Sequence, residues 1–163
     1  MIKNGIGGCK TVKNGLCFEE KTYLADLLLK KGYPLQLIEN KKIKSKIKGY
    51  QLIEDGVPAI IVTRGARIYK DIESLYGVNV RVGLSGRLWP DDALIDIKNG
   101  IVYILEKKFQ STKGSVDEKL QTCDFKKKQY QKMFEKIGLE VKYTYVCCDF
   151  FKKDKYRDVV EYI

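Results

Sequence analysis

The amino-acid sequence predicts an α/β fold in which helices flank a mixed central β-sheet. Three features support this prediction: a helical repeat near the N-terminus, a hairpin signal in the middle, and a later helical segment followed by an apolar strand. The 163 residues suit one domain, and a hydrophobic content of 44% is enough to fill its core. We therefore expect residues 1–163 to form a single domain, an α/β sandwich.

The N-terminal part predicts one helix and then two or three strands. Apolar residues recur at helical spacing across 17–31, and Gly32 is a typical helix end. The segment 34–62 contains two clear β-rich runs joined by a lysine-rich connection. Residues 67–76 favour a helix, and the glycine- and arginine-rich stretch 77–90 predicts irregular structure.

The strongest local signal is a β-hairpin within residues 91–108. The apolar runs 93–97 and 101–105 flank Asn99-Gly100, a pair typical of a two-residue type I′ turn.

The C-terminal part predicts a helix, a strand and a short final helix. Ser115 and Glu118 form a capping box for a helix that runs to about Lys136 and ends at Gly138. An apolar, aromatic strand follows over 141–148, and 155–163 favour a short helix.

Composition limits the possible chemistry. The chain has no histidine, which excludes Ser-His-Asp hydrolysis, histidine-metal nucleases and two-histidine zinc sites. Any hydrolysis would therefore depend on carboxylates, lysines and a hard metal ion. The chain start lacks the apolar core of a signal peptide, and no segment is apolar enough to span a bilayer. We expect a soluble cytoplasmic protein without a membrane partner. A disulfide framework is not expected from the five cysteines, Cys9, Cys17, Cys123, Cys147 and Cys148.

The net charge of +10 favours a polyanionic partner, because each neutralised phosphate releases counterions. Lysine-rich composition can also reflect the genome alone, and charge does not separate the two explanations.

The predicted hairpin brings charged side chains together. With Asn-Gly as a two-residue turn, Asp91 lies opposite Lys108, and Glu106 lies two residues earlier on the second strand. Because side chains alternate along a strand, Asp91, Glu106 and Lys108 share one face. Asp92, Asp96 and Lys107 share the opposite face.

Two carboxylates and an amine on one face have a chemical use. Asp91 and Glu106 supply oxygen ligands for a hard divalent cation, and the backbone carbonyl of Lys107 could supply another. A bound cation lowers the pKa of its water and stabilises charge on a phosphodiester. Lys108 can orient or help deprotonate that water and offset developing negative charge.

A purely structural interpretation of the same residues stays open. Similar Glu-Lys runs arise by chance in a lysine-rich chain, as at Glu118 and Glu135. A cross-strand Asp–Lys pair also stabilises ordinary sheets, and a bulge would shift the register. Against this, the strand ending at 105–108 carries charge where a buried strand would favour Val or Leu.

At these residues the sequence resembles the PD-(D/E)xK nuclease superfamily, which has the restriction endonuclease-like fold. The motif stands here as Pro90-Asp91, a strand, the turn and Glu106-Lys107-Lys108. The run 109–121 is similar to the stretch after the catalytic strand in some restriction enzymes, and the resemblance covers roughly 88–135. It implies that Asp91 and Glu106 bind Mg²⁺, with Mn²⁺ as a substitute, and that Lys108 is the catalytic lysine.

Members of this superfamily often add a glutamate from the first helix. The run 15–19 is similar to the helix start in archaeal Holliday-junction resolvases, whose glutamate helps to hold the metal. Glu19 is therefore expected as a further metal ligand, with Glu20 as the alternative. An acid near a helix N-terminus can also be favoured by the helix dipole alone.

The resemblance and the charge imply double-stranded DNA as a partner. Arginines in and near the glycine-rich region could read guanine, and lysines after the hairpin could contact phosphates. The residues expected to contact DNA are Arg64, Arg87, Gln110, Lys113, Ser115 and Lys119. Further basic residues of these two groups are Arg67, Arg81, Lys126, Lys127 and Lys128. For any single lysine, an ordinary solvated face is the favoured interpretation. Trp89 is expected to be a packing anchor.

Three functions follow as hypotheses. The first is a type II-like restriction endonuclease that cuts duplex DNA at a specific sequence as a homodimer. A DNA methyltransferase acting on the same site would then be a further partner. The second is a structure-specific nuclease of the junction-resolvase or repair type. The third is a basic nucleic-acid-binding module without cleavage.

Overall fold

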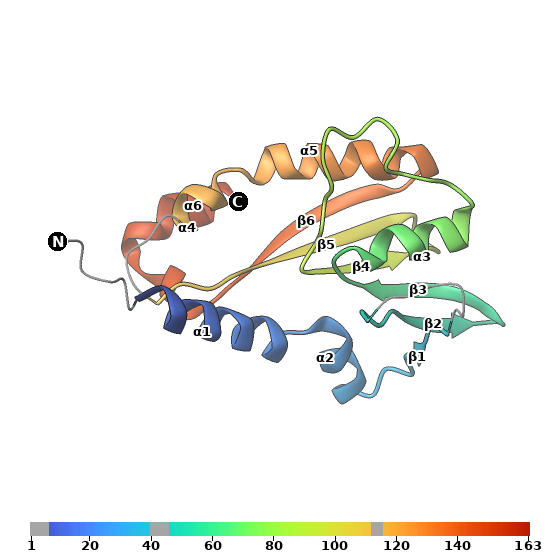
Figure 1. Cartoon of the computed structure of the whole chain (residues 1–163), viewed down its shortest axis with the longest axis horizontal. Helices are drawn as coiled ribbons and strands as arrows, with labels where there is room; N and C mark the ends of the chain where they lie inside the picture. Colours follow the sequence, from blue (N-terminus) through green and yellow to red (C-terminus); the bar gives the residue numbers. More distant parts are fainter. Residues whose placement is uncertain (1–6, 40–45, 112–115) are drawn as a thin grey trace.

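The computed structural model describes residues 7–39, 46–111 and 116–163. Its described part is built on a mixed six-stranded sheet in the order β1-β2-β3-β4-β5-β6 (Figure 1). Neighbouring strands are antiparallel except β5 and β6, which are parallel. The predicted α/β class with a mixed sheet is therefore confirmed.

The elements have the following bounds. The strands are β1 (Gln36–Leu37), β2 (Tyr50–Glu54), β3 (Val57–Thr63), β4 (Asp92–Asp96), β5 (Ile101–Lys108) and β6 (Glu140–Cys147). The α-helices are α1 (Gly7–Lys21), α2 (Leu24–Lys30), α3 (Arg67–Tyr76), α4 (Val116–Leu120), α5 (Cys123–Phe134) and α6 (Arg157–Tyr162). Short 3-10 helices are η1 (Glu135–Ile137), η2 (Asp149–Lys152) and η3 (Asp154–Tyr156).

Helix α3 has the bounds predicted from the sequence, and Gly77 closes it at a φ of 66°. The predicted helix over 17–31 is instead two helices, α1 and α2. The break falls before Leu24, whose backbone N–H donates to Asp92 Oδ2 at 2.9 Å. A side chain from the sheet thus binds the first N–H of α2, which periodicity along one segment cannot reveal.

The second predicted helix is also divided, into α4 and α5. At the junction the Thr122 hydroxyl donates to the carbonyl of Lys119 at 2.8 Å, where α4 ends. The segment ends as predicted at Gly138, whose φ is 72°. The capping residue Ser115 lies outside the described residues.

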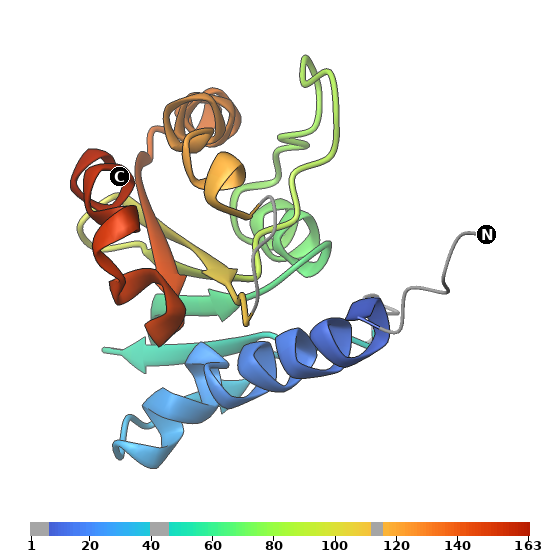
Figure 2. The same cartoon turned by 90° about the vertical axis from the view of Figure 1, so that its left-hand side faces the viewer.

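Helices cover both faces of the sheet (Figure 2). Alternate residues of β3, β4, β5 and β6 pack with α3 and α5 into the main core. Its most buried members include Ile61, Ile95, Val102, Ile104, Ile68, Ile72, Tyr130 and Phe134. Helices α1 and α2 lie against the other face. Within the described ranges, no helix is both long and apolar enough to cross a membrane.

The β4–β5 hairpin corrects the predicted turn and register. The connection is a four-residue loop, 97–100, in place of a two-residue type I′ turn. Asp96 accounts for the longer loop, because its carboxylate accepts hydrogen bonds from the backbone and side chain of Asn99 at 3.0 and 2.8 Å. Ile95 pairs with Val102, two positions from the predicted partner. A shift of two leaves every side chain on its predicted face.

Candidate active site

Asp91, Glu106 and Lys108 meet at the open end of the hairpin, as the predicted faces require. Just before the start of β4, the Asp91 side chain takes the place of a backbone partner in the ladder. Its Oδ2 accepts a hydrogen bond from the backbone N–H of Lys107 at 2.6 Å. The carbonyl of Pro90 is turned instead to the N–H of Gly65, at 2.7 Å. The strands therefore separate at the motif, and the side chain of Asp91 stays on the side of Glu106.

Glu106 lies in a largely buried, charged environment. Its Oε2 is 3.1 Å from Lys108 Nζ, and its Oε1 accepts a hydrogen bond from the Tyr130 hydroxyl at 3.5 Å. Burial raises the pKa of Glu106, and the negative charge of Asp91 raises it further, while Lys108 and Lys126 lower it. A carboxylate in this position is costly without a nearby cation, which suits a metal ligand.

Helix α1 brings Glu19 towards the same group. Partial burial raises the pKa of Glu19, and repulsion from Asp91 adds to this, while Lys107, Arg64 and Lys108 lower it. The alternative residue, Glu20, is exposed. The geometry therefore favours Glu19 over Glu20 as the acid that interacts with the hairpin site.

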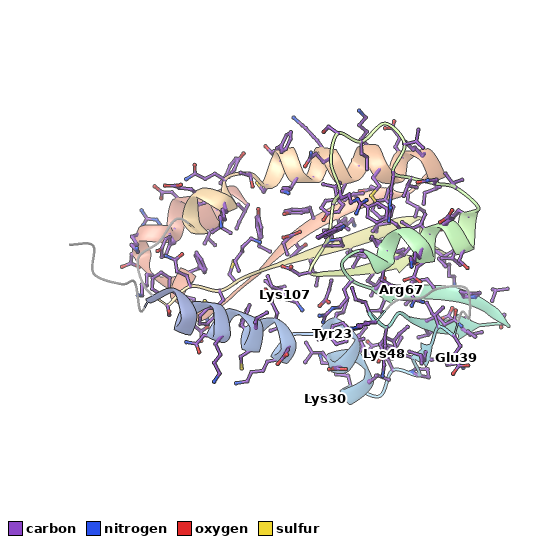
Figure 3. The ribbon with its side chains drawn as sticks, viewed as in Figure 1. Tyr23, Lys30, Glu39, Lys48, Arg67 and Lys107 are labelled. Atoms are coloured by element: carbon purple, nitrogen blue, oxygen red, sulfur yellow. The ribbon has the colours of Figure 1, made fainter. Side chains whose placement is uncertain are left out.

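A buried ion pair on the opposite face of the hairpin holds α1 in place. Lys107 Nζ lies 2.6 Å from Asp92 Oδ2, and both side chains are almost fully buried. The same ammonium donates to the backbone carbonyl of Glu19 at 3.1 Å. Figure 3 shows Lys107 between the sheet and α1. Burial raises the pKa of Asp92, and the hydrogen bonds from Lys107 and Leu24 offset part of this effect. This lysine thus joins the hairpin to the helix that carries Glu19.

The donor set fits a hard divalent cation in part. Asp91 and Glu106 offer carboxylate oxygens on one face, and repulsion between them would be relieved by a cation. The N–H of Lys107 points to Asp91, and in a strand the carbonyl of the same residue lies on the same side. In the described ranges, however, no three Asp, Glu, Cys or His side chains converge closely enough to enclose a metal ion. The described arrangement therefore provides two carboxylates on one face, and Glu19 of α1 feels the charge of Asp91 without completing a three-ligand group.

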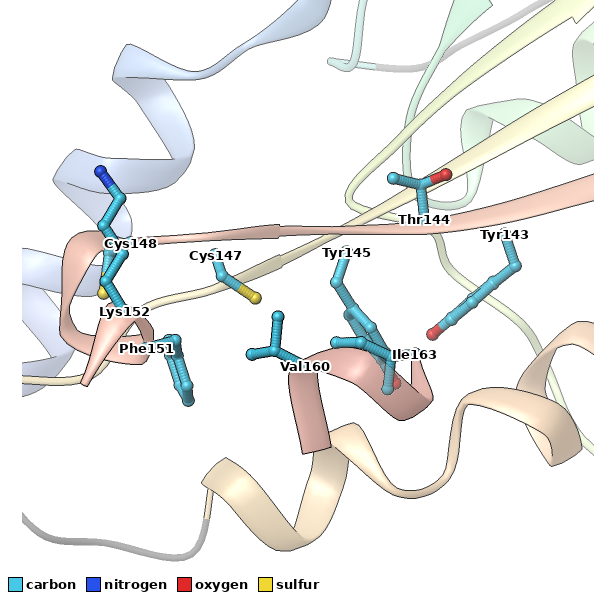
Figure 4. Close-up of a pocket in the computed structure, with 9 residues that line it drawn as sticks. All are labelled: Tyr143, Thr144, Tyr145, Cys147, Cys148, Phe151, Lys152, Val160 and Ile163. Carbon is cyan, nitrogen blue, oxygen red and sulfur yellow. The ribbon is translucent and has the colours of Figure 1, made fainter. Parts of the chain in front are cut away.

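A cavity of about 410 Å³ adjoins the Lys108 end of the site. Tyr143, Tyr145 and Cys147 project into it from β6, and Val160 and Ile163 close it from the C-terminal segment (Figure 4). Lys108 Nζ lies 5.5 Å from the centre of the Tyr145 ring. Tyr145 therefore contributes both to the lining of the cavity and to the surroundings of Lys108, which does not itself line the cavity.

The residues predicted to contact DNA have different environments. Arg87 and Lys119 are exposed. Gln110 is only 4% exposed, so its side chain is not presented as a surface contact, contrary to the expectation. Gln110 is buried because it lies beside the end of β6, where its backbone N–H donates a hydrogen bond to Cys148 Sγ at 3.4 Å. Lys113 and Ser115 lie outside the described residues.

Two further expectations near the motif were wrong. Trp89 is 57% exposed and is not a packing anchor, because the burial at this point falls on its neighbours Leu88 and Pro90. Arg67 is buried in an ion pair with Asp71 at 2.7 Å and is not available to read bases. Arg64 is half-buried and stacks on the Tyr23 ring, 4.8 Å from its centre.

Sequence reasoning missed Tyr130 and Lys126 of α5 as neighbours of Glu106. Only the packing of α5 over the hairpin brings them there, and the local sequence carries no signal for it. The Lys107–Asp92 pair could have been found, because the predicted register already placed both residues on one face. Among the cysteines whose side chains the structure describes, Cys17, Cys123, Cys147 and Cys148 are free.

Comparisons with protein families, with curated proteins and with solved structures gave no significant match. Functional inference for this chain therefore rests on the geometry described above.

Proposed function

We propose that this protein is a magnesium-dependent endonuclease that hydrolyses phosphodiester bonds of DNA, and that its sheet and helices form the restriction endonuclease-like fold. One observation carries the proposal: Asp91, Glu106 and Lys108 lie on one face at the open end of the hairpin, with Asp91 Oδ2 bound by the Lys107 N–H at 2.6 Å. A buried acid, a second acid and a lysine in this arrangement suit metal-assisted hydrolysis.

Each residue has a distinct proposed role. Asp91 and Glu106 would hold Mg²⁺, or Mn²⁺ as a substitute, together with the backbone carbonyl of Lys107. When bound, the cation lowers the pKa of its water and stabilises charge on the phosphodiester. Lys108, whose Nζ is 3.1 Å from Glu106, would donate to the attacking water and offset the developing negative charge. Glu19 would complete the ligand set from α1, at the position fixed by Lys107.

Double-stranded DNA is the proposed substrate because the chain carries a net charge of +10 and basic side chains surround the acidic pair. Cutting of a specific duplex sequence by a homodimer, with a methyltransferase protecting the same site, is the leading form of this proposal. The charge of Asp91 raises the pKa of Glu19, so the two acids interact. This interaction equally supports the alternative, a structure-specific nuclease of the junction-resolvase or repair type, because that alternative depends on an acid from the first helix.

A substrate panel tests the proposal. Mixed plasmid DNA, a short duplex and a four-way junction are incubated with the protein in Mg²⁺ and in chelator. Discrete Mg²⁺-dependent fragments from plasmid would support a restriction enzyme, and preferential cutting of the junction would support the structure-specific form. Binding without Mg²⁺-dependent cutting on any substrate would contradict the nuclease and leave a binding module.

A further inference from the structure

A small basic pocket lies beside the candidate active site. It has a volume of about 250 Å³ and is lined by Tyr23, Lys46, Ile47, Lys48, Tyr50 and Arg64. Three cationic side chains and two phenol groups thus surround one small space, and none of its lining residues is acidic. We propose that this Arg64 pocket binds a backbone phosphate of the DNA strand, next to the phosphate that is cut; the assignment of a cut phosphate rests on the proposed function.

Main-chain contacts place the pocket next to the motif. The N–H of Gly65 donates to the carbonyl of Pro90 at 2.7 Å, so Arg64 lies beside the residue that precedes Asp91. The charge of Arg64 is also felt by Glu19, whose pKa it lowers. The Arg64 side chain itself lies on the Lys107 face, where it stacks on Tyr23 and acts on Asp92. A strand whose phosphate reached Asp91 at the open end of the hairpin would therefore reach Arg64 by passing around that end.

The ring of Tyr23 forms the wall between the pocket and the buried ion pair. Arg64 Cζ lies 4.8 Å from the ring centre, and Lys107 Nζ lies 5.9 Å from it. Burial raises the pKa of Tyr23 to about 12, so its hydroxyl stays protonated at neutral pH. A protonated phenol and the planar fork of an arginine are both donors suited to phosphate oxygens.

A buried network beneath the pocket fixes its basic segment. Arg67 bonds to Asp71 at 2.7 Å and also donates to the carbonyl of Ile47 at 3.2 Å. Asp71 in turn accepts from the Thr63 hydroxyl of β3 at 2.6 Å. Gly49 allows the close approach, because a Cβ there would lie 3.0 Å from Asp71 Oδ2.

This network fixes Ile47, the residue between Lys46 and Lys48. Figure 3 shows Tyr23 and Lys48 near α2 and Arg67 nearer α3. Cations on a segment that is already fixed bind an anion at a lower entropic cost than cations on a free loop. The buried Arg67 thus supports phosphate binding without contacting the phosphate.

The test measures DNA affinity in chelator, so it does not depend on cleavage. Fluorescence anisotropy with a labelled short duplex compares the natural protein, the double variant Lys48→Ala with Arg64→Ala, and a control double variant, Lys98→Ala with Lys142→Ala. The control removes the same charge from exposed positions at the other end of the sheet. The pocket variant should bind about tenfold more weakly, with a salt slope reduced by about two, and the control should bind nearly as the natural protein does.

A single variant and a competition with inorganic phosphate extend the test. Lys48→Ala alone changes only an exposed side chain and should reduce the salt slope by about one. Equal affinity of the pocket and control variants would overturn the pocket. Displacement of DNA by inorganic phosphate at matched ionic strength, from the natural protein but not from the pocket variant, would support a DNA phosphate in the pocket. Pocket-dependent binding of inorganic phosphate that leaves the DNA affinity unchanged would assign the pocket to a free phosphate and overturn the DNA contact. Pocket-dependent binding without cleavage would support the pocket and contradict the nuclease, and cleavage without pocket dependence would do the reverse.

Discussion

Glu106 is the residue at which stability and the proposed function oppose each other most clearly. Burial and the negative charge of Asp91 raise its pKa above the ordinary 4.5, and Lys108 offsets only part of this effect. The folded protein therefore binds the Glu106 proton more tightly than the unfolded chain does. Protonation of this group stabilises the fold at low pH, and that stabilisation is lost as the pH rises through the raised pKa.

It follows that Glu106→Gln should stabilise the metal-free protein near neutral pH. The expected gain in the free energy of unfolding is about 0.5–2 kcal/mol, the usual size of a single stabilising substitution. Urea denaturation in chelator at several pH values measures it, and the gain should shrink as the pH falls and the natural side chain becomes protonated. If the variant is less stable at neutral pH, the ion pair between Glu106 and Lys108 contributes more stability than burial of the Glu106 carboxylate costs.

Lys108 should affect the rate of the reaction and not the binding of metal. Lys108→Met removes the ammonium 3.1 Å from Glu106 Oε2 but leaves both carboxylates in place. We expect single-turnover cleavage to slow by roughly 10²–10⁴-fold, the usual contribution of a positioned acid or base. Mn²⁺ affinity should change little, and Lys142→Met provides the matched control. Loss of Mn²⁺ binding in the Lys108 variant would show that the lysine holds the site together.

At the scale of elements, the hairpin joins the helices to the site through the Lys107–Asp92 pair. The ammonium contacts Asp92 at 2.6 Å and the carbonyl of Glu19 at 3.1 Å, and Asp92 also binds the first N–H of α2. One buried pair thereby connects β4, β5, α1 and α2. Its role is positional, because it lies on the face away from Glu106.

Breaking this pair should destabilise the fold strongly. Lys107→Met or Asp92→Leu alone leaves an unpaired buried charge, with an expected loss of about 3–5 kcal/mol in the free energy of unfolding. The double variant should lose less than either single variant, because no charge then remains buried. Chemical denaturation of all three gives the coupling energy. If the loss in the double variant equals the sum of the two single losses, the two side chains do not interact directly.

The hairpin also shows what could be predicted from the sequence. Alternation along two strands placed Asp91, Glu106 and Lys108 on one face, and this survived because the register changed by an even number of residues. The four-residue loop was not predictable from Asn-Gly alone, because it depends on hydrogen bonds from Asn99 to the side chain of Asp96. A register error of one residue would have placed Asp91 on the face opposite Glu106 and Lys108.

For the whole molecule, the class of fold and the mixed sheet follow from periodicity, but the surroundings of the site do not. Tyr130 reaches Glu106 only because α5 packs across the sheet. Arg67 can be buried only because it donates hydrogen bonds to Asp71 and to the carbonyl of Ile47. Trp89 was expected inside and is exposed, because its two neighbours take the buried positions. Such contacts join segments far apart in the chain, and local sequence patterns do not record them.

The most direct test of a nuclease centred on the hairpin compares two aspartates: Asp91, which immediately precedes β4, and Asp96, the last residue of β4. Asp91→Asn and Asp96→Asn are the same chemical change, but Asp96 lies at the loop end of the hairpin, on the opposite face and bonded to Asn99. Supercoiled plasmid is incubated with each variant and with the natural protein, in Mg²⁺ and in chelator. We predict Mg²⁺-dependent cutting by the natural protein and by Asp96→Asn, and none by Asp91→Asn. Full cutting by Asp91→Asn, or cutting that persists in chelator, would contradict the proposed site.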